Sequence, residues 1–275
     1  MATAPAPSGR TGPLGSLRVA RLGGANERLL YGLIGFVLFT GIWETAANAG
    51  LFRRSLLSSP SLIWNAAVAD FSSGAIWPHL SVSLSEFAIG FVVALAIGIP
   101  LGLVIGMFRR VDYFVSVLLF GIYATPKAAV APLIILVAGI GMESKVILVF
   151  LLTFFSVVVS TMAGVHAVAE RHTEIARSFG ASRWLTFRSV VLPSTVPFVL
   201  TGIRIATGRA LVGVVVAEEL AASAGIGFYI EFFGTFLDTA RVMLGVVLLG
   251  TFGIVLGELV RRIEKRFEVW RPENR

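Results

Sequence analysis

The stretch LSVSLSEFAIGFVVALAIGIPLGLVIGM, residues 80–107, contains 28 residues and a single charge, Glu86. A helix needs about 20 mostly apolar residues to cross a bilayer, so this stretch predicts a membrane span. Five further stretches meet the same criterion: 29–49, 113–138, 146–168, 194–217 and 240–260. Hydrophobic residues make up 56% of the 275-residue chain and charged residues only 14%, against about 25% charged in a soluble domain. The sequence therefore predicts an all-α membrane protein with about six transmembrane helices.

Several kinds of chemistry are excluded by what the sequence lacks. There is no cysteine, which excludes disulfides, thiolate metal sites and thiol nucleophiles. The three histidines are scattered, so we expect no metal site and no catalytic residues. No G-x-x-x-x-G-K-[ST] phosphate loop occurs, so the chain cannot hydrolyse ATP itself.

The formal charge of +7 reflects orientation in the membrane. Most of the 23 lysines and arginines lie before the first span, around 109–110 and 171–188, and after residue 260. The opposite connections hold only Arg53, Arg54, Lys145 and Arg241. Because basic loops stay in the cytoplasm, both termini are predicted to be cytoplasmic. Nucleic-acid binding is not needed to explain the charge.

Small residues and prolines mark where the spans pack closely or bend. Gly90, Ala94, Gly98, Gly102 and Gly106 fall four apart, a stripe that allows close approach of another helix. Gly253 and Gly257 have the same spacing in the last span. Kinks or unwound stretches are expected at Pro100 in the second span and at Pro126 and Pro132 in the third.

The stretch AERHTEIARSFGASRWLTFRSVVLP, residues 169–193, is too patterned for a simple connector. Ile175 and Phe179 share one face of a short helix, and Gly180 suits a left-handed cap at its end. Ser182 suits the N-cap of a second short helix, and Pro193 suits the first turn of the fifth span. We expect two short helices that either dock on a cytoplasmic partner or rest on lipid headgroups.

This loop resembles the EAA loop of bacterial ABC importer permeases, which reads E-A-A, three residues, G, nine residues, I, one residue, L-P. Here Glu174, Ile175 and Ala176 precede Gly180 by the family's spacing, and Val190 is followed after one residue by Leu192 and Pro193. The departures, Ile175 for alanine and Val190 for isoleucine, are apolar for apolar.

Other stretches are similar to one branch of that family, the nitrate, sulfonate, taurine and bicarbonate permeases. They are YATPKAAVAPLIILVAGIG (123–141), GIRIATGRALVGVVVAEEL (202–220), AGIGFYI (224–230) and the pair Trp43-Glu44. The resemblance implies a type I importer fold in the inner membrane, with two separate ATP-binding subunits that hold ATP and magnesium. It also implies a solute-binding protein, a second permease copy forming a homodimer, and no cofactor on this chain.

The resemblance assigns coupling to the ATPase to six positions: Glu174, Ala176, Gly180, Ala181, Leu192 and Pro193. The chain then divides into four parts. They are a disordered cytoplasmic tail (1–28), the first span with an external amphipathic helix (29–79), the core permease domain with the coupling loop 169–193 (80–262), and a cytoplasmic tail (263–275).

Three cations lie deep in the predicted spans: Lys127, Arg204 and Arg209. Ionisable groups at this depth mark either function or a paired structural role. In one interpretation, these cations pair with Glu44, Glu86, backbone carbonyls or helix ends. In the other, they line a watery pathway for an anion. Arg204 and Arg209 lie about 140° apart around a helix, so at most one points squarely into a pathway.

The segment 218–238 is predicted to lie outside and is still apolar. It either folds back to help form an external gate or presents Glu218, Glu219, Glu231 and Asp238 to the solute-binding protein.

The main alternative function is a secondary transporter driven by an ion gradient, but internal repeats and paired acids at mid-depth are not evident. The predicted spans also lack the nucleophile and base, or the metal ligands, that an intramembrane enzyme would need.

Overall fold

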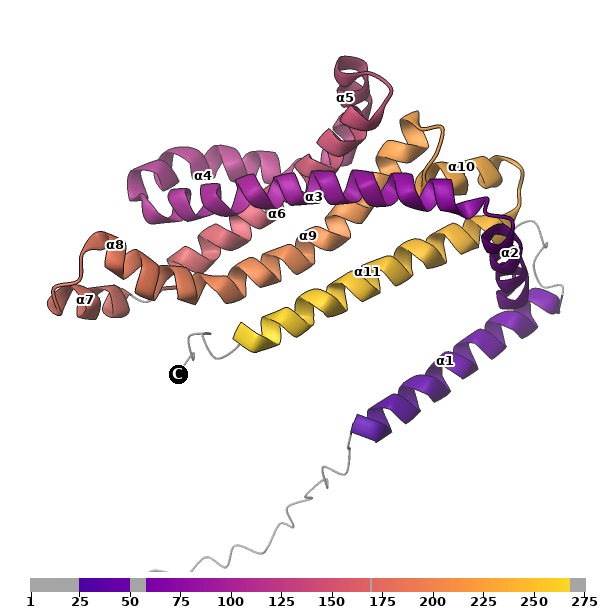
Figure 1. Cartoon of the computed structure of the whole chain (residues 1–275), viewed down its shortest axis with the longest axis horizontal. Helices are drawn as coiled ribbons and strands as arrows, with labels where there is room; N and C mark the ends of the chain where they lie inside the picture. Colours follow the sequence, from indigo (N-terminus) through magenta and orange to yellow (C-terminus); the bar gives the residue numbers. More distant parts are fainter. Residues whose placement is uncertain (1–24, 50–57, 169, 268–275) are drawn as a thin grey trace, which may run out of the picture.

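The computed structural model describes residues 25–49, 58–168 and 170–267, and this part of the chain is built of helices without β-strands (Figure 1). In chain order they are α1 (Ala25–Asn48), α2 (Pro60–Ser72), α3 (Ile76–Met107), α4 (Arg109–Ala124), the 3-10 turn η1 (Lys127–Val130), α5 (Ala131–Ala138), α6 (Met142–His166), α7 (Glu170–Ser178), α8 (Arg183–Thr186), the π-helical turn η2 (Phe187–Val191), α9 (Leu192–Ala221), α10 (Ile226–Thr235) and α11 (Thr239–Phe267).

The described chain has five candidate spans, or six if one bent pair of helices counts as a broken span, in agreement with the prediction of about six. The five are helices that are long and apolar enough to cross a membrane. The expected span 113–138 is not straight, because α4 and the segment Lys127–Ala138 meet at 81°. The break falls at Pro126, which lacks an N–H and holds Thr125 in an extended conformation. By contrast, Pro100 lies inside the continuous helix α3.

One predicted boundary near the chain ends needs correction. Helix α1 begins at Ala25, inside the tail 1–28 that was expected to be disordered. Helix α11 extends to Phe267, so it includes the first residues of the expected tail 263–275. The remaining residues of both expected tails, 1–24 and 268–275, lie outside the described residues.

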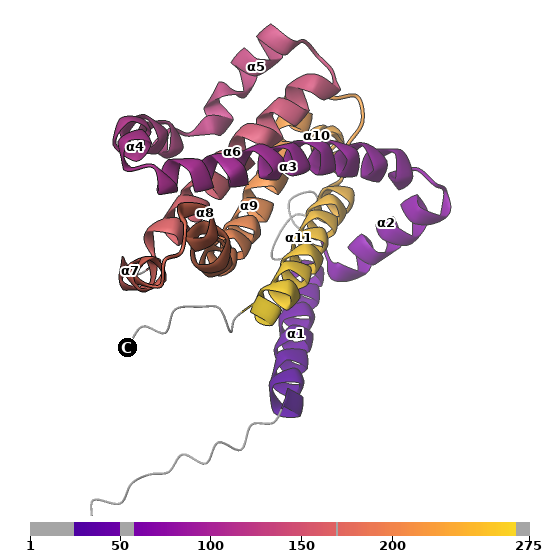
Figure 2. The same ribbon diagram turned by 60° about the vertical axis from the view of Figure 1, so that its left-hand side comes forward.

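Helix α6 packs between α3 and α9, and this three-helix unit forms the centre of the bundle (Figure 2). The predicted stripe on α3 faces α6. A Cβ added at Gly90 would lie 2.7 Å from the Val149 side chain, and one at Gly102 would lie 2.8 Å from the Val158 carbonyl oxygen. Of the two glycines spaced four apart in the last span, only Gly253 packs closely, against the Leu211 side chain. Gly257 has open space around it.

Helix α1 extends away from this bundle and packs mainly on α2 (Figures 1 and 2). The Trp43-Glu44 pair makes the junction. The indole N–H of Trp43 donates to the Ser58 carbonyl at 2.8 Å, and the Glu44 carboxylate accepts from the backbone N–H and the hydroxyl of Ser61 at 3.0 and 2.7 Å. The helix expected between the first and second spans is present as α2, although its exposed residues include Leu62, Trp64 and Val68, so an amphipathic pattern is not confirmed.

The two ends of the bundle carry different elements. Helices α7 and α8 lie at one end, beyond the end of α6 and the start of α9, whereas α2 and α10 lie at the other (Figure 1). The residues discussed below therefore fall into three groups: at the α7–α8 end, inside the bundle and at the α10 end.

Close packing of α3 on α6 makes a glycine prediction possible. Gly102→Ala should lower the stability of the purified protein by about 1–3 kcal/mol, because the added methyl group overlaps the backbone of α6. Gly257→Ala is the matched control and should be neutral or slightly stabilising, since the site is open and alanine favours the helix. Thermal unfolding in detergent measures both, and equal melting temperatures would contradict the packing argument.

Candidate functional site

The first group lies in the loop 169–193, where α7 ends in a left-handed cap. Gly180 has a φ of +78°, its N–H donates to the Arg177 carbonyl at 2.8 Å, and the Ala181 N–H donates to the Ala176 carbonyl at 3.0 Å. These are the two bonds of a Schellman motif. No other group lies within 4 Å of the position of a Gly180 Cβ, so the backbone conformation alone demands glycine. The predicted cap is confirmed.

The second half of the loop differs from the expected separate helix. Ser182 caps α8 as predicted, accepting from the Leu185 N–H at 3.2 Å. Helix α8 then continues through η2 into α9, so that Arg183–Ala221 is one continuous helix. In the π-helical turn the Leu192 N–H donates to the Phe187 carbonyl. A proline in a regular helix clashes with the carbonyl four residues earlier, and the wider turn before Pro193 relieves that clash with Ser189.

The loop exposes large apolar side chains at the end of the bundle. The exposed fractions are 88% for Phe179, 68% for Trp184, 51% for Leu185 and 46% for Ile175. A hollow of about 360 Å³ between α7 and η2 is lined by Ile175, Ala176 and Val190 among others. Glu174 is exposed on α7, while Leu192 and Pro193 begin α9. An apolar patch with a polar rim of this kind is typical of a surface that meets a partner.

The second group consists of two of the predicted deep cations. Lys127 Nζ lies 5.2 Å from the centre of the Tyr123 ring, and the Arg209 guanidinium lies 4.7 Å from the same ring. Lys127 also donates to the Tyr123 and Thr125 carbonyls at 2.8 and 3.3 Å, which the break after α4 has left without helix partners. Tyr123 was not predicted as a site residue, although its position four residues before Lys127 was a usable signal.

Arg204, the third predicted cation, lies apart from the other two. Its guanidinium forms a 3.3 Å ion pair with Glu264 of α11, and Glu264 also accepts from the Thr201 hydroxyl at 3.0 Å. Neither Glu44 nor Glu86 pairs with the deep cations in the described chain. Glu86 instead binds Lys145 at 2.7 Å. Glu264 lies 60 residues from Arg204 in the sequence, so local pattern gave no signal for this pair.

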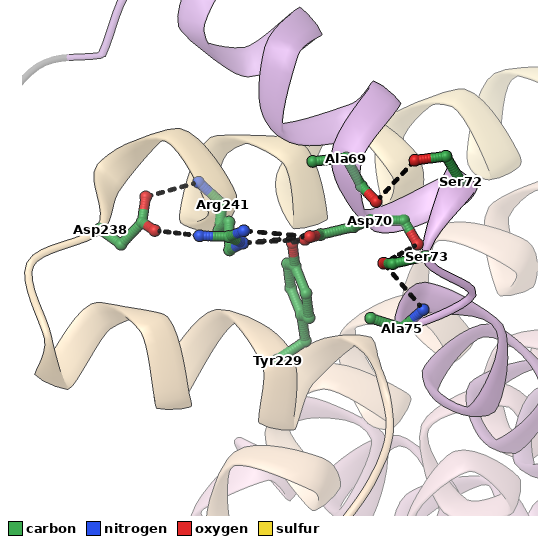
Figure 3. Close-up of polar contacts among 8 residues, drawn as sticks. All are labelled: Ala69, Asp70, Ser72, Ser73, Ala75, Tyr229, Asp238 and Arg241. Atoms are coloured by element: carbon green, nitrogen blue, oxygen red, sulfur yellow. Dashed lines mark hydrogen bonds and ion pairs between the residues drawn. The ribbon is translucent and has the colours of Figure 1, made fainter.

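The third group joins α2, α10 and α11 at the opposite end (Figure 3). Asp70 accepts from Arg241 Nε at 2.9 Å and from Arg241 Nη2 at 3.1 Å, a two-pronged ion pair. The Tyr229 hydroxyl donates to Asp70 at 2.5 Å, and Arg241 Nη1 also binds Asp238 at 2.7 Å. The guanidinium lies 4.9 Å from the centre of the Phe233 ring. These contacts fix α2 against α10 and the start of α11.

The charges of this cluster shift the ionisation of its members. Burial raises the pKa of the Asp70 carboxyl, but hydrogen bonds from Arg241 and Tyr229 and the charge of Arg241 outweigh it, so the pKa lies below its ordinary value. Burial, together with the hydrogen bond to Asp70, raises the pKa of the Tyr229 hydroxyl. Tyr229 therefore stays a donor at neutral pH.

Comparison with known proteins gives a family match over residues 98–269, to the binding-protein-dependent transport system inner membrane component. The taurine transport system permease protein TauC of Escherichia coli (strain K12) is 32% identical over 86% of this chain and 88% of that protein. A putative aliphatic sulfonates transport permease protein, SsuC of Bacillus subtilis (strain 168), is 30% identical over 87% of each chain. The formylaminopyrimidine transport permease protein ThiX of Halalkalibacterium halodurans is 31% identical over 87% of this chain and 95% of that protein.

Solved structures share the fold at lower identity. A chain of the MetNI methionine ABC transporter in an inward-facing conformation is 18% identical, with a TM-score of 0.56 over 70% of this chain and 94% of that chain. A chain of an amino acid ABC transporter crystallised with histidines is also 18% identical, with a TM-score of 0.52 over 70% of this chain and 96% of that chain.

The Asp70 cluster supports a prediction on stability and its pH dependence. Asp70→Asn should cost about 2 kcal/mol at neutral pH, because the buried Tyr229 hydroxyl and the half-buried Arg241 guanidinium would lose their charged acceptor. Since the pKa of Asp70 is lowered in the folded protein, its contribution is complete above the ordinary carboxyl pKa of about 4 and is lost as the pH falls through the lowered pKa.

Unfolding of the wild type and the variant should therefore converge at acidic pH. The control is Asp238→Asn, whose side chain is 31% exposed and should contribute less. A stability difference that is constant from pH 7 to pH 3 would contradict the proposed role of the Asp70 charge.

Proposed function

Because the chain belongs to the family of binding-protein-dependent transport system inner membrane components, it is the permease of an ABC importer, and we propose that it imports a small anion. The observation that carries the anion is the placement of Lys127 and Arg209 on one tyrosine ring. Within the described residues neither cation forms an ion pair with an acid. The relatives favour this function over a secondary transporter driven by an ion gradient.

The charges and two of the relatives support the proposed class of anion. Lys127 and Arg209 are half-buried, and cations within membrane-spanning segments are costly unless something compensates their charge. The stacking on Tyr123 compensates in part, worth about 0.5–2 kcal/mol for each cation. A transported anion would compensate more. Two of the relatives are named for taurine and for aliphatic sulfonates, and sulfonates are anions at neutral pH. We infer a solute of the nitrate, sulfonate, taurine or bicarbonate class.

The energy source in this proposal is a pair of ATP-binding subunits that carry ATP and magnesium and bind the loop 169–193. The exposed apolar side chains Phe179 and Trp184 support docking of a protein there. Glu174, Ala176, Gly180 and Ala181 form the docked helix and its cap, and Leu192 and Pro193 join it to α9. Because α8 and α9 form one helix, movement of the docked loop would swing α9 as a rigid body.

The assembly in this proposal is a homodimer in the inner membrane with a solute-binding protein on the outer side. Both chain termini and the loop 169–193 face the cytoplasm. Support comes from the basic residues on the α7–α8 end, including Arg177, Arg183 and Arg188, since basic residues are retained in the cytoplasm.

Docking can be tested at Gly180. Gly180→Val should reduce co-purification of the ATP-binding subunit several-fold, because a β-branched residue at a φ of +78° distorts the cap of α7. Gly139→Val is the matched control, with a φ of +82°, equally open space and a position at the other end of α6. Equal retention of the ATP-binding subunit by both variants would refute docking through this loop.

The anion pathway can be tested with Arg209→Gln in the reconstituted importer. Loss of one charged contact should raise the apparent KM for uptake about tenfold, equivalent to about 1.4 kcal/mol. Arg204→Gln is the control and should leave the apparent KM unchanged, because Arg204 is bound by Glu264. The solute for this assay is identified first, by a ligand screen of the solute-binding protein that begins with taurine, ethanesulfonate, nitrate and bicarbonate. Normal uptake at unchanged KM by Arg209→Gln would refute the cationic pathway.

A further inference from the structure

Glu218 lies at the outer end of α9 and is buried, with only 1% of the residue exposed. The sequence left two roles open for the segment 218–238, an external gate or contact with the solute-binding protein, and the burial of Glu218 contradicts the second role for this residue. Its carboxylate accepts from the Ser83 hydroxyl of α3 at 2.6 Å and from the Gly227 N–H of α10 at 2.6 Å. The Ser83 oxygen in turn accepts from the Ile226 N–H at 2.7 Å. Two of the first amides of α10 are thus held by side chains of α3 and α9.

The backbone before α10 is shaped to reach this carboxylate. Gly225 has a φ of +129°, and a Cβ at that position would overlap the carboxyl group of Glu218. A Cβ at Gly227 would lie 2.7 Å from the Val215 carbonyl oxygen and 2.9 Å from Glu218 Cβ. The glycines of the AGIGFYI stretch therefore allow the start of α10 to lie directly on α9.

Helix α3, which supplies Ser83, is itself linked to α6. Glu86 lies three residues after Ser83 on α3 and forms a 2.7 Å ion pair with Lys145 near the start of α6. Both side chains of that ion pair are at least nine-tenths buried. Helices α6 and α9 flank the loop 169–193, so the buried cluster Lys145, Glu86, Glu218 and Ser83 joins α10 to the far ends of both helices.

We propose that Glu218 is a positioning residue for transport, which fastens α10 to α9 so that α10 moves with the helices joined by the loop 169–193. Movement at the α7–α8 end then reaches the outer surface through the body α3–α6–α9 and through this carboxylate. The Asp70 cluster holds the opposite face of α10 to α2 and α11, so α10 bridges two parts of the bundle. This inference rests on the docking proposed above.

The experiment uses the assembled complex with its ATP-binding subunits and a spin label on α10. The chain has no cysteine, so Thr235→Cys supplies a single labelling site at the exposed end of α10. Trapping the complex with ATP and vanadate should change the label's spectrum in the otherwise wild-type chain. Glu218→Gln should abolish at least half of that change, since a glutamine oxygen cannot replace both carboxylate oxygens as acceptors.

Two further variants define the outcome. Glu219→Gln changes the exposed neighbour and should keep the full spectral change. Ser83→Ala should also reduce the spectral change. It replaces Glu218→Gln as the test variant if the Glu218→Gln complex does not assemble. A full spectral change in Glu218→Gln or Ser83→Ala, or none in the parent complex, would overturn the proposal. Failure of docking is distinguished by loss of the ATP-binding subunit on purification, which changes at Glu218 should not cause.

Discussion

The whole structure depends on satisfying polar groups inside a medium that offers no water. Hydrocarbon leaves every backbone N–H and carbonyl to be bonded within the protein. Long helices do this alone, and at two breaks in the described chain side chains supply missing partners. Lys127 bonds the carbonyls left at the break after α4, and Glu218 and Ser83 bond the amides that begin α10. Charged residues in the bundle thus appear beside irregular backbone.

Close packing has a second consequence, which is rigidity. The glycines of α3 bring its backbone against α6, and Gly213 of α9 approaches the backbone of Val149 from the other side. Three helices in such contact shift together more easily than they deform, because packed interiors have few intermediate arrangements. A movement at one end of this unit would therefore be felt at the other without a separate mechanical element.

The deep arginines show how a single helix assigns different roles to the same residue type. Arg204 meets Glu264 and is neutralised as an ion pair, while Arg209 stacks on Tyr123 beside Lys127. The difference lies in which neighbour each face of α9 meets. One face meets the carboxylate of α11 and the other meets the aromatic end of α4. In the proposed pathway, only the second arrangement would leave positive charge available to a solute.

The sequence by itself determined the features that depend on local pattern. Hydropathy predicts the spans, and Gly180 and Ser182 predict the helix caps of the loop 169–193. Pro126 predicts the break in the third span, and motif spacing indicates the family. The tertiary structure decided the pairings, such as Asp70 with Arg241, 171 residues apart, and Ser83 with Glu218, 135 residues apart. It also decided that Glu218 is buried and that α8 continues into α9. Helix caps and spans are fixed by neighbours in the chain, whereas the partner of a charge depends on which helices pack together and at what depth.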